Sequence, residues 1–243
     1  MCHTAAVSDA RRDRSRNGGC GIFEIVNPFA TRFVRPDQNR YRFSLDPLTE
    51  SAQFDAFLVR LFKLLEHPRL AAIVGPHGTG KTTLLRSIEP ALRDQFERVI
   101  AIGLSSERRH SYRELITTLD STGNHSSTSQ CLVVDGFEQL PWWDRTFLVR
   151  EILKRPGISL IVTSHRQHLR VPVCWQTQWN DELSRRLTQE KLCEVPENLR
   201  IAMWQRFERR MQHQTNSPRN LRDLWFMMYD EYEAMMAEER QMQ

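Results

Sequence analysis

The chain has 243 residues, which is enough for one α/β domain with a small appended module. Its positive excess is mild, with 34 Lys and Arg against 30 Asp and Glu, and apart from residues 11–16 its arginines are scattered, so nucleic acid is not indicated as a partner. Five separated cysteines argue against a zinc site and fit a reducing compartment, and no apolar run reaches the roughly 20 residues of a membrane span, so we expect a cytoplasmic protein without a membrane anchor.

The first part of the chain lacks a sheet pattern. Residues 1–21 are polar and rich in arginine, which predicts a flexible tail. The stretch from Asn27 to Pro47 mixes proline, asparagine and aromatic residues and is expected to be an ordered loop against a domain. From Glu50 to His67 apolar residues recur at helical spacing, which predicts an amphipathic helix that ends before Pro68.

Short apolar runs then alternate with helical patterns. Predicted strands cover residues 70–74, 99–102, 131–134 and 158–163, and a fifth near Val171 is limited to an edge by Pro172. Predicted helices cover residues 81–95, 112–119 and 141–154. Continuously apolar strands separated by helices predict a parallel sheet with helices on both faces. Residues 22–180 are therefore expected to form a three-layer α/β domain.

The pattern becomes purely helical from Asp181 onward. Helices are predicted over residues 181–192 and 197–211 and from residue 219 to the C-terminus, so residues 181–243 are expected to form a helical lid or packing module. Apolar residues at helical spacing in the last helix predict contact with a core. Upstream, Trp142 and Trp143 follow Pro141, and we interpret them as packing residues of their helix in preference to a partner-binding patch.

A complete phosphate-loop motif, GxxxxGK[ST], stands between the first predicted strand and the following helix. Glycines let main-chain N–H groups approach phosphate oxygens, and the helix N-terminus attracts the same anion. Lys81 is expected to reach the β- and γ-phosphates, Thr82 to coordinate Mg²⁺ and Thr83 to support the α-phosphate. The expected nucleotide-binding residues are Gly75, Pro76, His77, Gly78, Thr79, Gly80, Lys81, Thr82 and Thr83. ATP is favoured because no guanine-reading motif is present.

Polar residues end two other predicted strands. Asp135 closes an apolar strand and is the candidate second anchor for Mg²⁺, although Asp-Gly is also a turn pair. Glu138 is the candidate that orients or deprotonates the attacking water, and its alternative is a surface acid at a helix start. Thr163 and Ser164 end the next strand, where they would sense the γ-phosphate or the water, or merely begin a loop.

The ordered set of residues 75–82, 132–138 and 161–164, followed by a helical tail, resembles the AAA+ and STAND branch of P-loop ATPases. Asp135-Gly136-Phe137-Glu138 is similar to the extended strand motif of NACHT-type proteins. The resemblance implies that Thr163 or Ser164 is sensor 1 and that Arg222 matches sensor 2, which would stabilise transferring charge. It departs from the family pattern because no glutamate follows Asp135 directly and no arginine finger is marked.

The leading hypothesis is a Mg²⁺-dependent ATP hydrolase that acts as a molecular switch on a macromolecular partner, with a protein partner expected and homo-oligomerisation an option. One alternative is a small-molecule or nucleoside kinase, which shares the phosphate loop but usually lacks a strand between the loop strand and the acidic strand. A second alternative is a nucleotide-binding scaffold that does not hydrolyse, because Gly136 stands where many ATPases have the catalytic glutamate.

Overall fold

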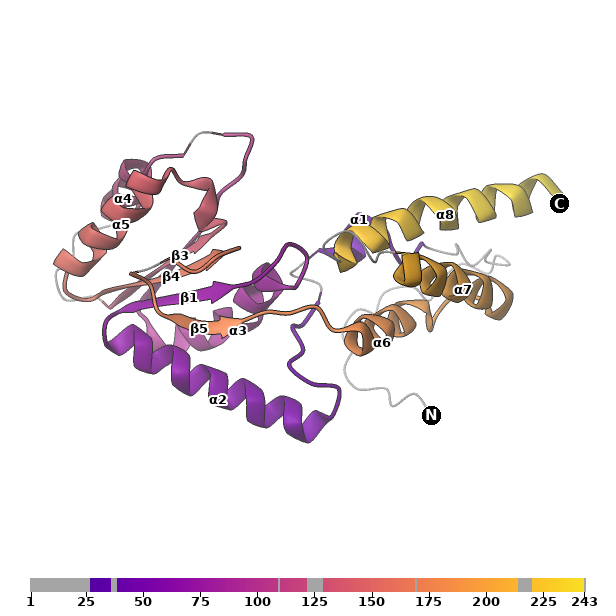
Figure 1. Ribbon diagram of the computed structural model, residues 1–243, viewed down its shortest axis with the longest axis horizontal. Coiled ribbons are helices and arrows are strands. Elements are labelled where there is room, and N and C mark those ends of the chain that lie inside the picture. Colours follow the sequence, from indigo (N-terminus) through magenta and orange to yellow (C-terminus); the bar gives the residue numbers. More distant parts are fainter. Residues whose placement is uncertain are drawn as a thin grey trace, which may run out of the picture.

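A computed structural model describes residues 27–35, 39–108, 110–121, 129–168, 170–213 and 220–242. The predicted flexible tail at residues 1–21 and most of the predicted linker at residues 121–130 lie outside these residues. The described part consists of a sheet covered by helices and a separate group of helices beside it (Figure 1).

Five parallel strands form one sheet in the order β2-β3-β4-β1-β5. The strands are β1 (Leu70–Val74), β2 (Arg98–Gly103), β3 (Gln130–Asp135), β4 (Ile158–Ser164) and β5 (Val173–Gln176). β4 lies between β1 and β3, so the strand that leads into the phosphate loop and the strand that ends in Asp135 are not neighbours. β5 is an edge strand, as the proline before it requires.

Helices cover both faces of the sheet, which confirms the predicted three-layer α/β fold (Figure 1). Alternate residues of a strand point to opposite faces. Leu70 and Ala72 of β1 accordingly pack with α4 (Tyr112–Ser121) and α5 (Trp142–Lys154), whereas Ala71 and Ile73 pack with α2 (Pro47–Glu66) and α3 (Lys81–Gln95). Each predicted helix in this part of the chain is present.

The helical module has its own core. It contains α6 (Asp181–Leu192), α7 (Glu197–His213) and α8 (Leu221–Met242), joined by the short helix α1 (Thr31–Val34). Met203, Phe207, Met228 and Tyr232 are almost fully buried there, so the apolar stripe of the last helix makes the core contact that its spacing predicts. The boundary at residue 181 stays a prediction.

The segment before α2 belongs partly to this module. Phe29 is fully buried among α6, α7 and α8, and the side-chain amide of Asn27 donates to Glu233 of α8 at 2.8 Å. Further along, the carboxylate of Glu50 accepts hydrogen bonds from the main chain of Phe43 and Ser44, each at 2.6 Å, which fixes the loop against α2. The expected ordered loop therefore contacts both parts of the molecule.

The paired tryptophans do not pack into the sheet domain as expected. Trp142 is 56% exposed and Trp143 is 64% exposed. Trp143 lies on the side of α5 opposite to Leu148, Val149 and Ile152, which are turned to the sheet, and Trp142 is the first residue of the helix. Among the residues that the structure describes, no helix is long and apolar enough to cross a membrane.

Candidate functional site

The phosphate loop joins β1 to α3 at the carboxyl ends of the parallel strands. Gly78 has φ +70° and Gly80 has φ +89°, a left-handed conformation that L side chains rarely adopt. The main-chain N–H of Gly75 donates to the carbonyl of Ser164 at the end of β4, at 3.1 Å. These glycines let the chain turn sharply between β1 and the N-terminus of α3, and the role of the loop toward phosphate stays a prediction.

Lys81 is the first residue of α3, and its side chain turns back over the loop. Its ammonium group donates to the carbonyls of Gly75 at 2.8 Å and Pro76 at 2.7 Å, and the residue is only 9% exposed. Burial lowers the pKa of Lys81, while the carboxylates of Glu138 and Asp135 act in the opposite direction. The ammonium therefore lies near two acidic groups, at the mouth of the loop.

A hydrogen-bond network centres on Asp135 at the end of β3. One carboxylate oxygen accepts from the Thr82 hydroxyl at 2.8 Å, and the other accepts from the Thr163 hydroxyl at 2.5 Å. The Thr163 hydroxyl in turn accepts from the main-chain N–H of Gly136 at 2.8 Å. The structure thus brings together three polar residues that the sequence marks on three different elements.

Replacing Thr163 with Val keeps the volume of the side chain and removes its hydroxyl. We expect the free energy of unfolding to fall by about 1–3 kcal/mol, because Gly136 loses its hydrogen-bond acceptor in a buried place and Asp135 loses one donor. Chemical denaturation measures the change. Thr163→Ser retains the hydroxyl and should stay close to the wild type; equal losses in both variants would contradict this assignment.

The donor set beside α3 suits a magnesium ion. Mg²⁺ takes oxygen ligands and keeps several waters. The Thr82 hydroxyl and the Asp135 carboxylate lie 2.8 Å apart at a small pocket of about 70 Å³ that Arg86 and Gly103 also line. These residues fit the ion, with Thr82 as the direct ligand and Asp135 as a partner through water. Both metal roles remain predictions.

Glu138 follows in a short 3₁₀ helix, η2 (Phe137–Gln139), and faces β4. One of its carboxylate oxygens lies 3.2 Å from Nε2 of His165. The other is buried and has no hydrogen-bond partner within the described part of the chain. The ring of His165 also contacts the ring of His77 from the phosphate loop, with centroids 3.5 Å apart. Burial lowers the pKa of His165 despite the opposing effect of Glu138, which favours the neutral imidazole.

Other residues of the predicted set lie close by with structural partners. Ser164 is 4% exposed, and its hydroxyl accepts from the main chain of Arg166 at 3.4 Å. The Thr79 hydroxyl lies 2.6 Å from that of Thr177, and the Thr83 carbonyl accepts from Ser87. Their predicted roles toward phosphate are not tested by these contacts.

Three residues that the sequence does not mark as candidates lie against the glycines of the phosphate loop. A β-carbon placed at Gly78 would lie 1.7 Å from the Asn220 side chain, and one placed at Gly75 would lie 2.1 Å from Thr177. One placed at Gly80 would lie 3.0 Å from the ring of Tyr41. Only the fold could reveal these contacts, because the three residues come from the N-terminal loop, the end of β5 and the start of α8.

Arg222 is exposed on the first turn of α8, and its main-chain N–H donates to the Asn220 side chain. The residue therefore stands two positions from a contact with the phosphate loop, and its sensor role stays a prediction. Two arginines of the helical module are paired with acids, Arg185 with Glu208 and Arg186 with Glu190, whereas Arg166 lines a cleft of about 760 Å³ beside Gly75 and His165.

Comparison with known proteins identifies the fold. No family model matches the sequence, and no curated protein sequence is similar to it. The structure resembles the Aeropyrum pernix Orc1 protein in complex with DNA, with a TM-score of 0.55 and 15% identity over 88% of this chain and 64% of that chain. It resembles Drosophila ORC bound to DNA with a TM-score of 0.54 and 12% identity over 98% of this chain and 66% of that chain.

These likenesses confirm the predicted P-loop α/β fold, and the resemblance to AAA+ proteins holds at the level of the fold. The strand order agrees with it, since β4 stands between the phosphate-loop strand and the acidic strand. The likeness to the NACHT-type branch stays a prediction. The chain spans slightly less than two thirds of the length of each of these two solved proteins.

Proposed function

We propose that this protein binds ATP with Mg²⁺ and hydrolyses it, and that the cycle switches the position of the helical module. One observation carries the proposal: Lys81, Thr82, Asp135 and Glu138 converge from three elements at the carboxyl edge of the sheet. An ammonium group, two oxygen ligands for a hard cation and a carboxylate are the groups that phosphoryl transfer to water requires.

Each residue has a distinct task in this proposal. Lys81 compensates the negative charge of the terminal phosphates, and the main-chain N–H groups of the loop position them. Thr82 and Asp135 hold Mg²⁺, which neutralises charge on the same phosphates. Thr163 fixes Asp135 by its hydrogen bond.

Glu138 is the proposed general base. One carboxylate oxygen has no hydrogen-bond partner among the described residues, so it keeps its capacity to accept a proton, and the other oxygen lies 3.2 Å from Nε2 of His165. This arrangement compensates for the absence of an acid directly after Asp135, because the 3₁₀ turn after Gly136 brings Glu138 back toward Lys81.

The alternatives receive less support. A small-molecule kinase of the common type has its acidic strand beside the loop strand, whereas β4 separates the two here. A scaffold that binds ATP without hydrolysis would not need a carboxylate oxygen that is buried without a hydrogen-bond partner near Lys81.

The candidate partners of this protein include more classes of macromolecule than the sequence alone indicates. The scattered arginines do not indicate nucleic acid, but the two solved structures compared above are complexes with DNA. We therefore propose a macromolecular partner and include DNA among the candidates, together with protein and a second copy of this chain.

Heat protection tests the nucleotide assignment. A ligand that binds only the folded state at about 100 times its Kd contributes about 2.7 kcal/mol, which raises Tm by about 5–10 °C for a protein of this size. We expect this rise with ATP and Mg²⁺ in thermal unfolding, a smaller rise with ATP and EDTA, and none with GTP. A larger rise with GTP than with ATP would reject ATP as the ligand.

A further inference from the structure

Exposed aromatic side chains gather on the outer face of α4 and α5. Trp142, Trp143 and Phe147 of α5 are 56%, 64% and 44% exposed. Tyr112 of α4 extends the group, since its ring lies 5.5 Å from that of Phe147 at an interplanar angle of 31°. Large aromatic rings exposed together on a surface mark a binding site more often than an isolated exposed residue does.

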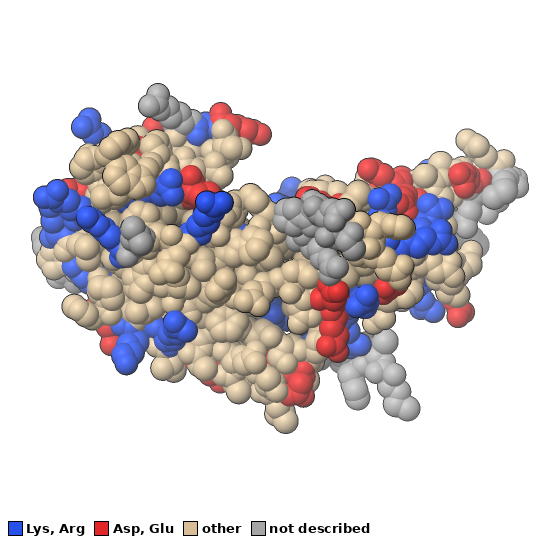
Figure 2. Space-filling view, in the orientation of Figure 1, with Lys and Arg blue, Asp and Glu red and all other residues tan. Residues whose placement is uncertain are grey.

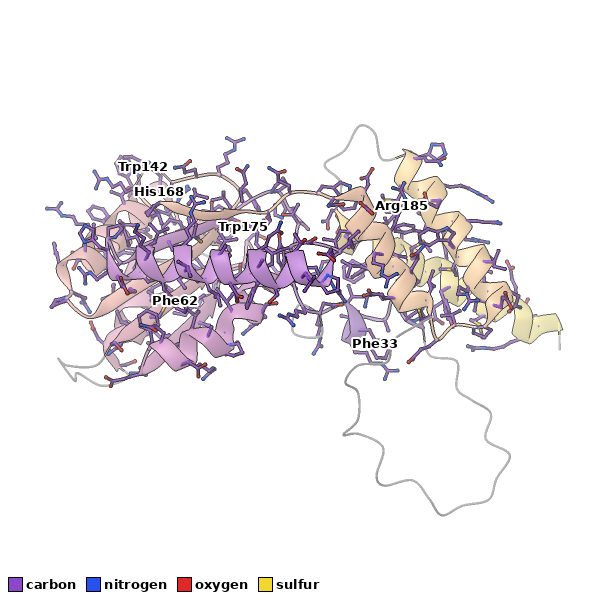
Figure 3. The ribbon with its side chains drawn as sticks, turned by 90° about the horizontal axis from the view of Figure 1, so that it is seen from below. Phe33, Phe62, Trp142, His168, Trp175 and Arg185 are labelled. Atoms are coloured by element: carbon purple, nitrogen blue, oxygen red, sulfur yellow. The ribbon has the colours of Figure 1, made fainter. Side chains whose placement is uncertain are left out.

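Arginines occur on the same helices and on the loop that carries His168. Arg113 lies next to Tyr112, and Arg150 is exposed one helical turn after Phe147. Arg145 and Arg170 both lie close enough to His168 to help lower its pKa, after the larger effect of burial. Figure 3 shows Trp142 and His168 at the same end of the molecule, far from Arg185 of the helical module. We call this set of rings and arginines the aromatic–arginine surface.

The acidic residues of α4 and α5 are largely neutralised. Glu114 pairs with Arg108, Glu151 pairs with Lys154, and Asp120 pairs with Arg155. Among the described residues, no ion pair within 4.0 Å is formed by four arginines: Arg113, Arg145, Arg150 and Arg170. The acid Asp144 lies near Arg113. Four arginines against one such acid leave the surface positive, and Figure 2 shows basic side chains at this end of the molecule.

We propose that the aromatic–arginine surface binds single-stranded nucleic acid. Unpaired bases stack on exposed aromatic rings, and guanidinium groups contact the phosphates between them. Aromatic residues and arginine are also enriched at protein interfaces, so self-association is measured beside oligonucleotide binding in the test below. The excess of unpaired positive charge favours a polyanion as the ligand. Duplex DNA offers no free base faces to the rings, so the surface selects single strands.

The surface lies outside the phosphate site but is joined to it through the chain. Trp142 begins α5 three residues after η2 ends, and η2 carries Glu138. Phe137 and Leu140, on either side of Glu138 and Gln139, are buried in the same core as α5. Binding on this surface uses none of the predicted phosphate contacts, so the inference goes beyond the ATPase proposal and can fail or hold independently of it.

The test is fluorescence anisotropy of a labelled 20-nucleotide oligothymidylate titrated with the full chain. We expect Trp143→Ala to weaken binding at least tenfold, because one stacking ring is lost, and Trp143→Phe to retain most of it. We expect Arg150→Gln to reduce the slope of log affinity against log salt by about one, since one phosphate contact is removed. Phe226→Ala is the matched control, because Phe226 is 40% exposed on α8.

Three results would overturn the proposal: no binding of the oligonucleotide, equal binding by wild type and Trp143→Ala, or a Trp143→Ala variant that loses self-association and keeps oligonucleotide affinity. Thermal unfolding checks that each variant is folded. A parallel titration with oligouridylate distinguishes RNA from DNA. Lys81→Ala should bind the oligonucleotide normally without ATP, which separates a failure of the ATPase proposal from a failure of this one.

Discussion

Replacing Lys81 with Ala is expected to abolish ATP hydrolysis and to weaken ATP binding about 10- to 100-fold. This loss corresponds to the about 1.5–3 kcal/mol that a hydrogen bond to a charged group contributes. The ammonium group of Lys81 lies at the mouth of the loop and donates to the carbonyls of Gly75 and Pro76, and in the proposed complex it would exchange these bonds for phosphate oxygens. Isothermal titration with ATP and Mg²⁺ measures the affinity, and phosphate release measures turnover.

The control for this variant is Lys154→Ala. Lys154 is exposed at the end of α5 and pairs with Glu151, so its loss removes one positive charge without touching the loop. The phosphate-loop assignment is supported if Lys154→Ala binds ATP with wild-type affinity and Lys81→Ala binds it more weakly. If Lys81→Ala bound ATP as well as the wild type does, the phosphate-loop assignment would be wrong.

Replacing Glu138 with Gln is expected to lower turnover about 10²- to 10⁴-fold, the contribution of a general base. ATP affinity should change little, because the substitution removes the proton acceptor and leaves Lys81, Thr82 and Asp135 in place. Single-turnover hydrolysis under saturating ATP measures the chemical step, and the same titration measures binding.

Glu151→Gln serves as the matched acid-to-amide change, on the exposed side of α5. It should retain wild-type turnover. A wild type no faster than Glu138→Gln, with ATP still bound, would replace the hydrolase proposal by the scaffold alternative. A loss of ATP binding in Glu138→Gln would instead mean that this carboxylate supports the structure of the loop.

Much of the sheet domain follows from local sequence patterns. Apolar runs such as residues 131–134 are too short and too continuous for amphipathic helices, so the sequence predicts them as strands. The glycine spacing between the first strand and the next helix predicts a phosphate loop. The position of β4 between β1 and β3 also agrees with the family that these motifs resemble.

Contacts between distant segments could not be read in the same way. The sequence gives Asn220 no special character, yet the fold places its side chain against Gly78. The pairing of His165 with Glu138 depends on how far the 3₁₀ turn carries the carboxylate toward β4. The tryptophans are exposed, contrary to the prediction, because Trp143 lies opposite the face that carries Leu148 and Ile152 and Trp142 stands at the start of the helix.

Two stretches of chain connect the sheet to the helical module, and both pass the phosphate loop (Figure 1). The first runs from Phe29, buried in the module, to Tyr41 beside Gly80; the second leaves β5 through Thr177, which lies against Gly75. Domain movements turn on a few residues of the connecting segments. In the proposed cycle a hinge in either segment would lie against the phosphate loop itself, so a change in the loop would reach the helical module through a direct contact.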